Sequence, residues 1–216
     1  PSLALVRRAY LWTYFHGRFG PLDQPANLAA CIAALARHGP IARLDIDLAA
    51  VAAELGRGRP GYDRLFALIG QAHARNRGRA RWGIQESGLE HHAERLLAAD
   101  PGTRILHVVR DPRDWYARVR ADARRRGGVG VATETWAAST SLGLRLASRH
   151  PDRYRIVRAE DLADDPATML RDICRFLGEP AAPEVEAEAR PPRAGAPAAA
   201  EGGAALPVMT EAEIAT

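Results

Sequence analysis

The sequence predicts an α/β fold in which a parallel sheet is flanked by helices. A short apolar run bounded by breakers, typical of a buried strand, occurs at residues 105–109, and residues 81–85 and 155–158 are two further strand candidates. Segments with helical spacing of apolar residues separate these strands, and this alternation favours parallel pairing with right-handed crossovers. Because three strands make a small sheet, we expect a further strand ahead of residue 1.

Four helical segments are predicted before the first of these strands. Apolar side chains recur at helical spacing in each segment, so each helix should bury one face. The second segment is closed by Gly39-Pro40 and the third by Gly56, residue types that end helices. The four segments cover residues 3–15, 28–35, 48–55 and 62–69. We expect their apolar stripes to cover the sheet or to shape a pocket.

Three more helices are predicted over residues 89–98, 133–149 and 166–177. The last begins at Pro166 after two aspartates and is closed by Gly178 and Pro180. After Pro180 the composition changes to Ala, Pro, Gly and Glu, which is typical of a tail or a long loop. We therefore expect one α/β domain over residues 1–180 and a loosely ordered segment over 181–216, with a short helix near its end.

Charge and composition narrow the classes of ligand. The chain has 216 residues, a formal net charge of +4 and a pI near 9.6, which favours an anionic ligand without requiring nucleic acid. No aromatic platform accompanies the arginine-rich stretch at 118–126, so we expect no nucleic-acid partner. All 30 basic residues are arginine, so no lysine is available to bind a phosphate.

The sequence also allows predictions of the protein's cellular location, the state of its cysteines and its metal content. No apolar run approaches the ~20 residues of a membrane span and no signal peptide is visible, so we expect a cytoplasmic protein without a membrane span. Cys31 and Cys174 lie in helical patterns and are expected to be reduced thiols. No spacing of Cys and His indicates a metal site.

The most informative stretch joins a strand to a helix through arginines. The apolar run at 105–109 ends in Arg110-Asp111-Pro112-Arg113, named the arginine turn below, and a helical pattern follows. Asp111 suits a helix N-cap, and Pro112 suits the first helical turn. Ligands of parallel sheets bind at the carboxyl ends of strands, and helix N-termini bind anions. Arg110 and Arg113 would add paired donors for a phosphate; a purely structural helix start is the alternative.

A second strand-to-helix stretch lies farther along the chain. It contains Ala159-Glu160-Asp161-Leu162 and, at the end of its helix, Phe176-Leu177-Gly178. With the arginine turn and Arg81-Trp82-Gly83 upstream, these segments resemble the sulfotransferases that depend on 3′-phosphoadenosine 5′-phosphosulfate (PAPS), particularly their bacterial branch. The resemblance runs from Arg81 to the end of that helix and implies a P-loop transferase fold. Glu160 and Asp161 would orient arginines of the arginine turn through ion pairs.

The resemblance also implies an activity and a co-substrate. A sulfuryl group would pass from PAPS to a hydroxyl or amine of a small-molecule or glycan acceptor. Arg110 would contact the 3′-phosphate, with Arg113 and Arg118 as further candidates. Arg118 stands where the family usually has serine, and it either replaces that contact or points to solvent. Ala159 stands where the family has an aromatic residue, and Gln85 where it has lysine.

The phosphate loop of that family is absent from this sequence. The Gly-rich run at 56–61 has the wrong residue order and setting for such a loop. We therefore predict that the native polypeptide carries a strand and a phosphate loop ahead of Pro1. The missing loop and the altered positions favour, as an alternative, a non-catalytic module that binds a nucleotide or a partner. A different P-loop transferase, such as a small kinase, is a third hypothesis.

Activation of an acceptor hydroxyl requires a general base. Glu86, at the end of a predicted strand, is the first candidate, and a helix cap or an ion pair is its structural alternative. His16, in the N-terminal segment, is the second candidate. His91 and His92 are adjacent on a short predicted helix and point about 100° apart, so at least one should face solvent.

Overall fold

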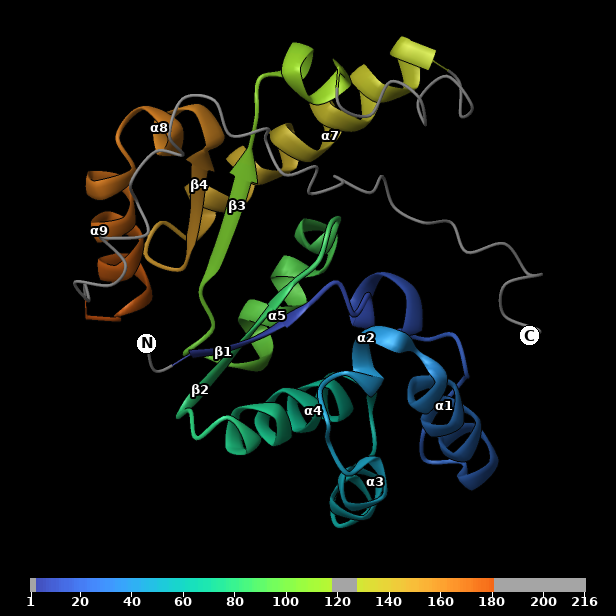
Figure 1. The fold of residues 1–216 in the computed structure, drawn as a ribbon. Helices are drawn as coiled ribbons and strands as arrows, with labels where there is room; N and C mark the ends of the chain where they lie inside the picture. Colours follow the sequence, from blue (N-terminus) through green and yellow to red (C-terminus); the bar gives the residue numbers. More distant parts are fainter. Residues whose placement is uncertain (1–2, 118–127, 181–216) are drawn as a thin grey trace. The chain divides into compact units, whose positions relative to one another are not determined.

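The computed structural model describes residues 3–117 and 128–180, and the chain divides into two compact units, Pro1–Gly102 and Thr103–Thr216 (Figure 1). Each unit holds a two-stranded parallel sheet with helices packed against it. The predicted α/β class and the parallel pairing are therefore confirmed. In the part of the chain described, the strands form two small sheets, where the sequence led us to expect one.

The sheet of the first unit consists of β1 (Leu3–Arg7) and β2 (Arg81–Gln85), which pair in parallel. The helix predicted over residues 3–15 is therefore wrong at its start. Ala4 and Val6 are buried, whereas Leu5 between them is 44% exposed, which is the two-residue period of a strand. Four consecutive apolar residues, Leu3 to Val6, fit either period, and pairing with β2 selects the strand. The further strand expected ahead of residue 1 stays a prediction.

The remaining elements of the first unit are helical. After β1 the chain forms a π-helix, η1 (Leu11–Phe15), and after β2 a 3-10 helix, η2 (Leu89–His92), runs into α5 (Ala93–Ala99). Between the strands lie α1 (Pro25–Arg37), α2 (Gly39–Ala42), α3 (Leu48–Gly56) and α4 (Tyr62–Asn76). The predicted helices are thus confirmed, except that Gly39-Pro40 begins a helix. Proline is suited to this position because it lies in the first helical turn.

Helix α4 organises the core of the first unit by packing against both strands. Its inward residues Leu65, Phe66 and Ile69 are fully buried and join a cluster with aromatic residues of η1. A Cβ added at Gly70 would lie 2.2 Å from the ring of Trp82, so α4 approaches β2 closely at this position because glycine has no side chain. This packing brings the N-terminal end of α4 to η1 and η2.

The second unit is built on β3 (Ile105–Val109) and β4 (Tyr154–Arg158), again parallel, with Val109 opposite Arg158. Helix α7 (Gly128–Arg149) packs on β4, and α8 (Ala159–Asp164) and α9 (Pro166–Leu177) follow (Figure 1). Both helices predicted for this part are confirmed. The start of α9 is fixed by Asp165, whose carboxylate accepts a hydrogen bond from the Thr168 N–H. Its end is fixed by Gly178, which adopts a left-handed conformation with φ 70°.

A polar contact inside the second unit joins both strands to α7. Tyr154 is 1% exposed, and its hydroxyl lies 2.8 Å from Nδ1 of His107 on β3. Nε2 of the same imidazole lies 3.3 Å from the hydroxyl of Ser139 on α7. A Cβ at Gly143 would lie 2.4 Å from His107 Nδ1, so α7 approaches β3 closely at this glycine. The strand ends that carry the arginine turn are therefore held on a fixed support.

Some predictions fall on residues that are not described. Arg118 and the segment 181–216, with its predicted short helix, lie outside the described residues. In the ranges 3–117 and 128–180, none of the helices has the length and hydropathy needed to cross a membrane. Cys31 is buried and Cys174 is half-buried, and both are free thiols as predicted.

Candidate functional site

The arginine turn lies where the two strands of the second unit end together. Because β3 and β4 are parallel and in register at Val109 and Arg158, the residues after each strand meet at one edge. There the N–H of Asp111 donates a hydrogen bond to the Glu160 carboxylate at 2.8 Å. This contact lowers the pKa of Glu160. The sheet therefore fixes the backbone of the turn through an acidic side chain from the neighbouring strand end.

Two further contacts hold the turn. The Asp111 carboxylate accepts a hydrogen bond from the Arg113 N–H at 2.8 Å, which makes Asp111 the cap of the helix that starts at Pro112. The indole N–H of Trp136 on α7 donates to the carbonyl oxygen of Arg110 at 2.8 Å. The predicted cap and first-turn proline are confirmed. The backbone around Arg110 is thus held on both sides.

The arginine side chains of the turn differ in what they contact. Arg113 donates from Nε and Nη2 to the two carboxylate oxygens of Asp111, at 2.9 and 2.7 Å. This pair holds the pKa of Asp111 well below its usual range. Arg110 is half-buried, and its positive charge acts on the Glu160 carboxylate, whose pKa it helps to lower, whereas Arg113 is held by two hydrogen bonds. Arg110 is therefore the better placed of the two to receive an anion, while Arg113 would first have to leave Asp111.

The two acidic residues after β4 lie near an arginine of that strand. Both are within ion-pair distance of Arg158, with Glu160 Oε2 at 3.8 Å and Asp161 Oδ1 at 3.5 Å. Glu160 thus contacts the backbone of the arginine turn, and the arginine it pairs with belongs to β4. Glu160 also interacts through charge with Arg110 of the turn, which helps to lower the Glu160 pKa, so the expected orientation of turn arginines by these acids stays a prediction.

Glu86 lies directly after β2, at the carboxyl edge of the first sheet. Its two carboxylate oxygens accept hydrogen bonds from the N–H groups of Leu11 and Trp12, the second at 3.2 Å. Burial raises the pKa of Glu86 to about 7, against the lowering effect of these bonds and of one from Thr13. The helix cap considered as the structural alternative is therefore present. The chain passes from β1 through a turn into the helix η1, and N–H groups at the start of such a helix are able to bind an anion. Here the N–H groups of Leu11 and Trp12 already bind the carboxylate of Glu86.

His16 is the centre of a cluster of ionisable side chains that the sequence did not reveal. It ends η1, and its Nε2 lies 3.7 Å from Oδ1 of Asp63 in the first turn of α4. The other oxygen of Asp63 accepts a hydrogen bond from Arg95 Nε at 2.7 Å. The imidazole of His92 lies 5.9 Å from that of His16, between ring centroids. We name these four side chains the His16 cluster.

The electrostatics of the His16 cluster favour neutral imidazoles. Burial lowers the pKa of His16, Arg95 lowers it further, and Asp63 opposes them by raising it. Burial also lowers the pKa of His92, helped by repulsion from His16 if that ring is charged. A neutral imidazole beside a carboxylate is able to accept a proton.

The His16 cluster contains polar atoms without hydrogen-bond partners. His16 Nε2 and Asp63 Oδ1 are both buried, and neither has a hydrogen-bond partner within the described ranges. Among the residues placed by the structure, no group of three or more Cys, His, Asp or Glu side chains is arranged to hold a metal ion.

Asp63 and Arg95 were missed by the sequence analysis. Asp63 carries the common signal of an acid in the first turn of a helix, which explains it without any function. Nothing in the sequence relates it to His16, which is far away along the chain. Only the packing of α4 against the first sheet and η1 brings them together.

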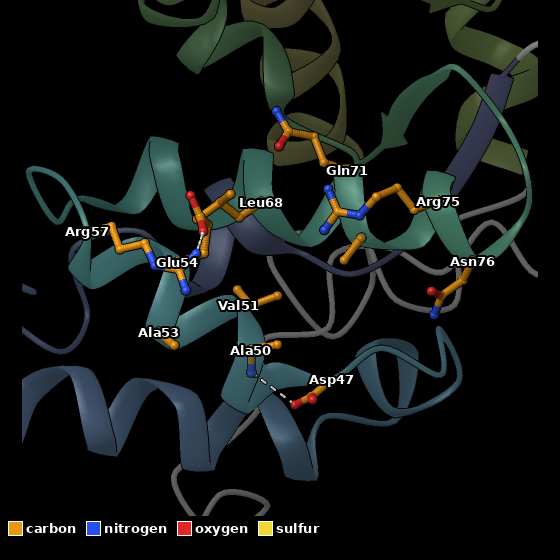
Figure 2. Close-up of a pocket in the computed structure, with 11 residues that line it drawn as sticks. Asp47, Ala50, Val51, Ala53, Glu54, Arg57, Leu68, Gln71, Arg75 and Asn76 are labelled. Atoms are coloured by element: carbon orange, nitrogen blue, oxygen red, sulfur yellow. Dashed lines mark hydrogen bonds and ion pairs between the residues drawn. The ribbon is translucent and has the colours of Figure 1, made fainter.

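A groove of about 630 Å³ lies elsewhere in the first unit, between α3 and α4 (Figure 2). Figure 2 shows side chains of the two helices facing one another across it. Several polar groups in its wall are used by the fold: Asp47 caps α3, and Glu54 pairs with Arg57. The residues that line the groove do not include any of the four side chains of the His16 cluster. We therefore treat the groove as separate from the His16 cluster.

Comparison with known proteins gives one family and one curated relative. The family described as the sulfotransferase family matches residues 28–183, well over half of the chain. Carbohydrate sulfotransferase 5 of Mus musculus is 32% identical over 114 residues, which is 42% of this chain and 29% of that protein. The match thus spans less than a third of the relative's length. No solved structure matches the chain.

Proposed function

The chain belongs to the sulfotransferase family, and we propose that the full-length protein transfers a sulfuryl group from PAPS to a hydroxyl or amine. The acceptor would be a small molecule or a glycan, and a relative named as a carbohydrate sulfotransferase supports the glycan class. The arginine turn lies inside the matched segment, which links the family to the residues that carry this proposal.

The observation that supports nucleotide binding most directly is the arrangement around Arg110. Arg110 is half-buried, and the backbone on either side of its side chain is held by Glu160 and Trp136. A guanidinium binds phosphate with paired, charge-assisted hydrogen bonds, and a held backbone limits the entropy lost on binding. We assign the 3′-phosphate to Arg110. Arg113 would join only after exchanging Asp111 for the nucleotide, and Arg118 stays a candidate outside the described residues.

For proton acceptance we favour His16 over Glu86. Both oxygens of Glu86 are engaged by backbone N–H groups, so its ionised form already has a structural role. The imidazole of His16 is favoured in its neutral form and is linked to Asp63. A positioned base of this kind contributes roughly 10²–10⁴-fold to a reaction. Glu86 remains the second candidate because a carboxyl with a pKa of about 7 is also able to take a proton near neutral pH.

The test is transfer of labelled sulfate from PAPS by the full-length protein to a panel of acceptors. The panel should contain phenols, amines, and neutral and acidic oligosaccharides. A labelled product with an equal amount of released 3′-phosphoadenosine 5′-phosphate (PAP) would support the proposal. Binding of ATP in preference to PAPS would instead favour a small kinase.

A second function is favoured by what this chain lacks. It has no lysine, and two groups suited to anion binding, Arg113 and the N–H groups after β1, are bound within the chain. These features fit a module that binds a nucleotide without turnover. Tight PAP binding with no transfer to any acceptor of the panel would favour that alternative.

A further inference from the structure

Three side chains of the His16 cluster, Arg95, Asp63 and His16, contact one another in sequence. Arg95 Nε holds one oxygen of Asp63 at 2.7 Å, and the other oxygen is turned to His16 Nε2 at 3.7 Å. The side chain of Asp63 is 31% exposed and that of His16 is 19% exposed. The order is therefore an arginine that fixes a carboxylate, which in turn faces an imidazole.

The rings around His16 restrict its imidazole to this direction. The Tyr62 ring lies 5.2 Å from the imidazole, the His92 ring 5.9 Å and the Phe66 ring 6.4 Å, between centroids. Tyr62 itself is fixed, since its hydroxyl donates to the Gly20 carbonyl and accepts from the Phe19 N–H. The imidazole is thus packed on several sides, and Asp63 is the carboxylate that faces it.

We propose that Asp63 is a positioning residue for His16: it orients the imidazole and stabilises the imidazolium that forms when His16 takes the proton of the acceptor. The inference rests on the proposed function. The separation of 3.7 Å is slightly longer than a hydrogen bond, and contacts of this kind commonly tighten when substrate binds. Arg95 contributes by holding the carboxylate in place.

The step balances with the groups already named. An oxygen or nitrogen of the acceptor donates an electron pair to sulfur, and its proton passes to Nδ1 of His16, because Nε2 is the buried ring nitrogen that faces Asp63. The bond between sulfur and the bridging oxygen of PAPS breaks, and its electron pair leaves with PAP. The imidazolium then faces Asp63 Oδ1, where opposite charges at close range stabilise each other. This is the logic of a base oriented by a third group.

The two charged neighbours of His16 shift its pKa in opposite directions, which gives a test of the proposal. Asp63 raises the pKa of His16, whereas Arg95 lowers it, and His92 and Tyr62 are the other ionisable neighbours. Asp63→Asn should therefore lower the pKa of His16, and Arg95→Gln should raise it. The acidic limb of the rate profile should move to lower pH in the first variant and to higher pH in the second. The plateau of kcat/KM in Asp63→Asn should fall by about tenfold or more.

The experiment combines activity with a readout that needs no turnover. Histidine ring signals are followed by NMR across pH in the full-length protein, with His16→Gln identifying the His16 signal. Asp23→Asn, an exposed aspartate of the same unit, is the control and should change neither pKa nor rate. PAP affinity should be the same in all variants.

The outcomes separate this inference from the proposed function. Opposite pKa shifts in the two variants, with the matching shifts of the rate profile, support the positioning role. Unchanged His16 titration in folded Asp63→Asn and Arg95→Gln overturns it, even if the wild-type protein transfers sulfate. If Asp63→Asn fails to fold, Arg95→Gln alone decides: a raised pKa of His16 supports the positioning role, and an unchanged pKa overturns it. Absence of transfer in the wild-type protein, with the NMR shifts present, overturns the catalytic role while leaving the pairing of Asp63 with His16 intact.

Discussion

Replacement of Glu86 tests how the first unit is held together. Glu86→Ala removes the acceptor of the Leu11 and Trp12 N–H groups in a partly buried position. Each buried donor left without a partner costs about 1–3 kcal/mol, so the loss of both bonds should lower the free energy of unfolding by about 2–6 kcal/mol. This is a large share of the ~5–15 kcal/mol that stabilises a typical domain.

Glu86→Gln tests the ionisation of the same carboxyl. The pKa of Glu86 rises from 4.5 to about 7 in the folded protein, so the folded state holds a proton that the unfolded state has lost between these values. Stability from this group is therefore full below about pH 4.5 and is lost as pH rises towards 7, by about 3 kcal/mol. Glutamine cannot ionise, so this loss should disappear in the variant.

The difference between the two proteins is the quantity to measure. His16, His38 and His92 have lowered pKa values, so they make the folded protein more stable as pH rises and partly mask the effect of Glu86 in either protein alone. Urea unfolding followed by far-UV circular dichroism at half-unit steps from pH 4.5 to 8 gives both curves. Asp23→Asn, at an exposed aspartate of the same unit, serves as control. Parallel curves for wild type and Glu86→Gln would refute the reasoning.

Two further predictions concern the second unit. Gly143→Ala should lower the free energy of unfolding by about 1–3 kcal/mol, because its Cβ would lie 2.4 Å from His107. The control is Gly130→Ala on the same helix, where a Cβ meets nothing within 4 Å, so this change should leave the free energy of unfolding the same or raise it. Thermal unfolding measures both, and equal shifts in the two variants would contradict the close approach of α7 to β3. Trp136→Phe removes the hydrogen bond to the Arg110 carbonyl and should weaken PAP binding by about two- to tenfold. Calorimetry measures this change, and unaltered affinity would show that Trp136 does not support the nucleotide site.

Local signals predicted much of the fold. Asp111, Pro112 and Gly178 punctuate helices through backbone chemistry that depends on a few neighbouring residues, and the structure shows each in its expected place. The prediction for residues 3–7 failed because four consecutive apolar residues do not distinguish the period of a strand from that of a helix. Their strand conformation is selected by pairing with β2, far along the chain. Similarly, the grouping of strands into two sheets depends on tertiary pairing that no local pattern encodes.

The candidate site was predictable only where it coincides with a strand end. Arg110 and Glu86 directly follow segments that were predicted as strands, so the sequence placed both at the carboxyl edges of sheets. What their side chains contact was not predictable, since the partners Trp136 and Leu11 come from distant segments. The pairing of His16 with Asp63 depends on how α4 packs, so the sequence alone does not distinguish Asp63 from any other acid in the first turn of a helix.

The most direct measurement of the central proposal is calorimetric titration of the full-length protein with PAP, beside Arg110→Ala and Arg145→Ala. Arg145 is an exposed arginine of α7, nine positions or about 13 Å along the helix from Trp136, and serves as the matched control. We predict micromolar binding by the wild type and by Arg145→Ala. Arg110→Ala should bind about 10- to 150-fold more weakly, the value of a charge-assisted hydrogen bond. Equal affinity in all three proteins, or no binding by the folded wild type, would contradict the assignment of Arg110 to the nucleotide.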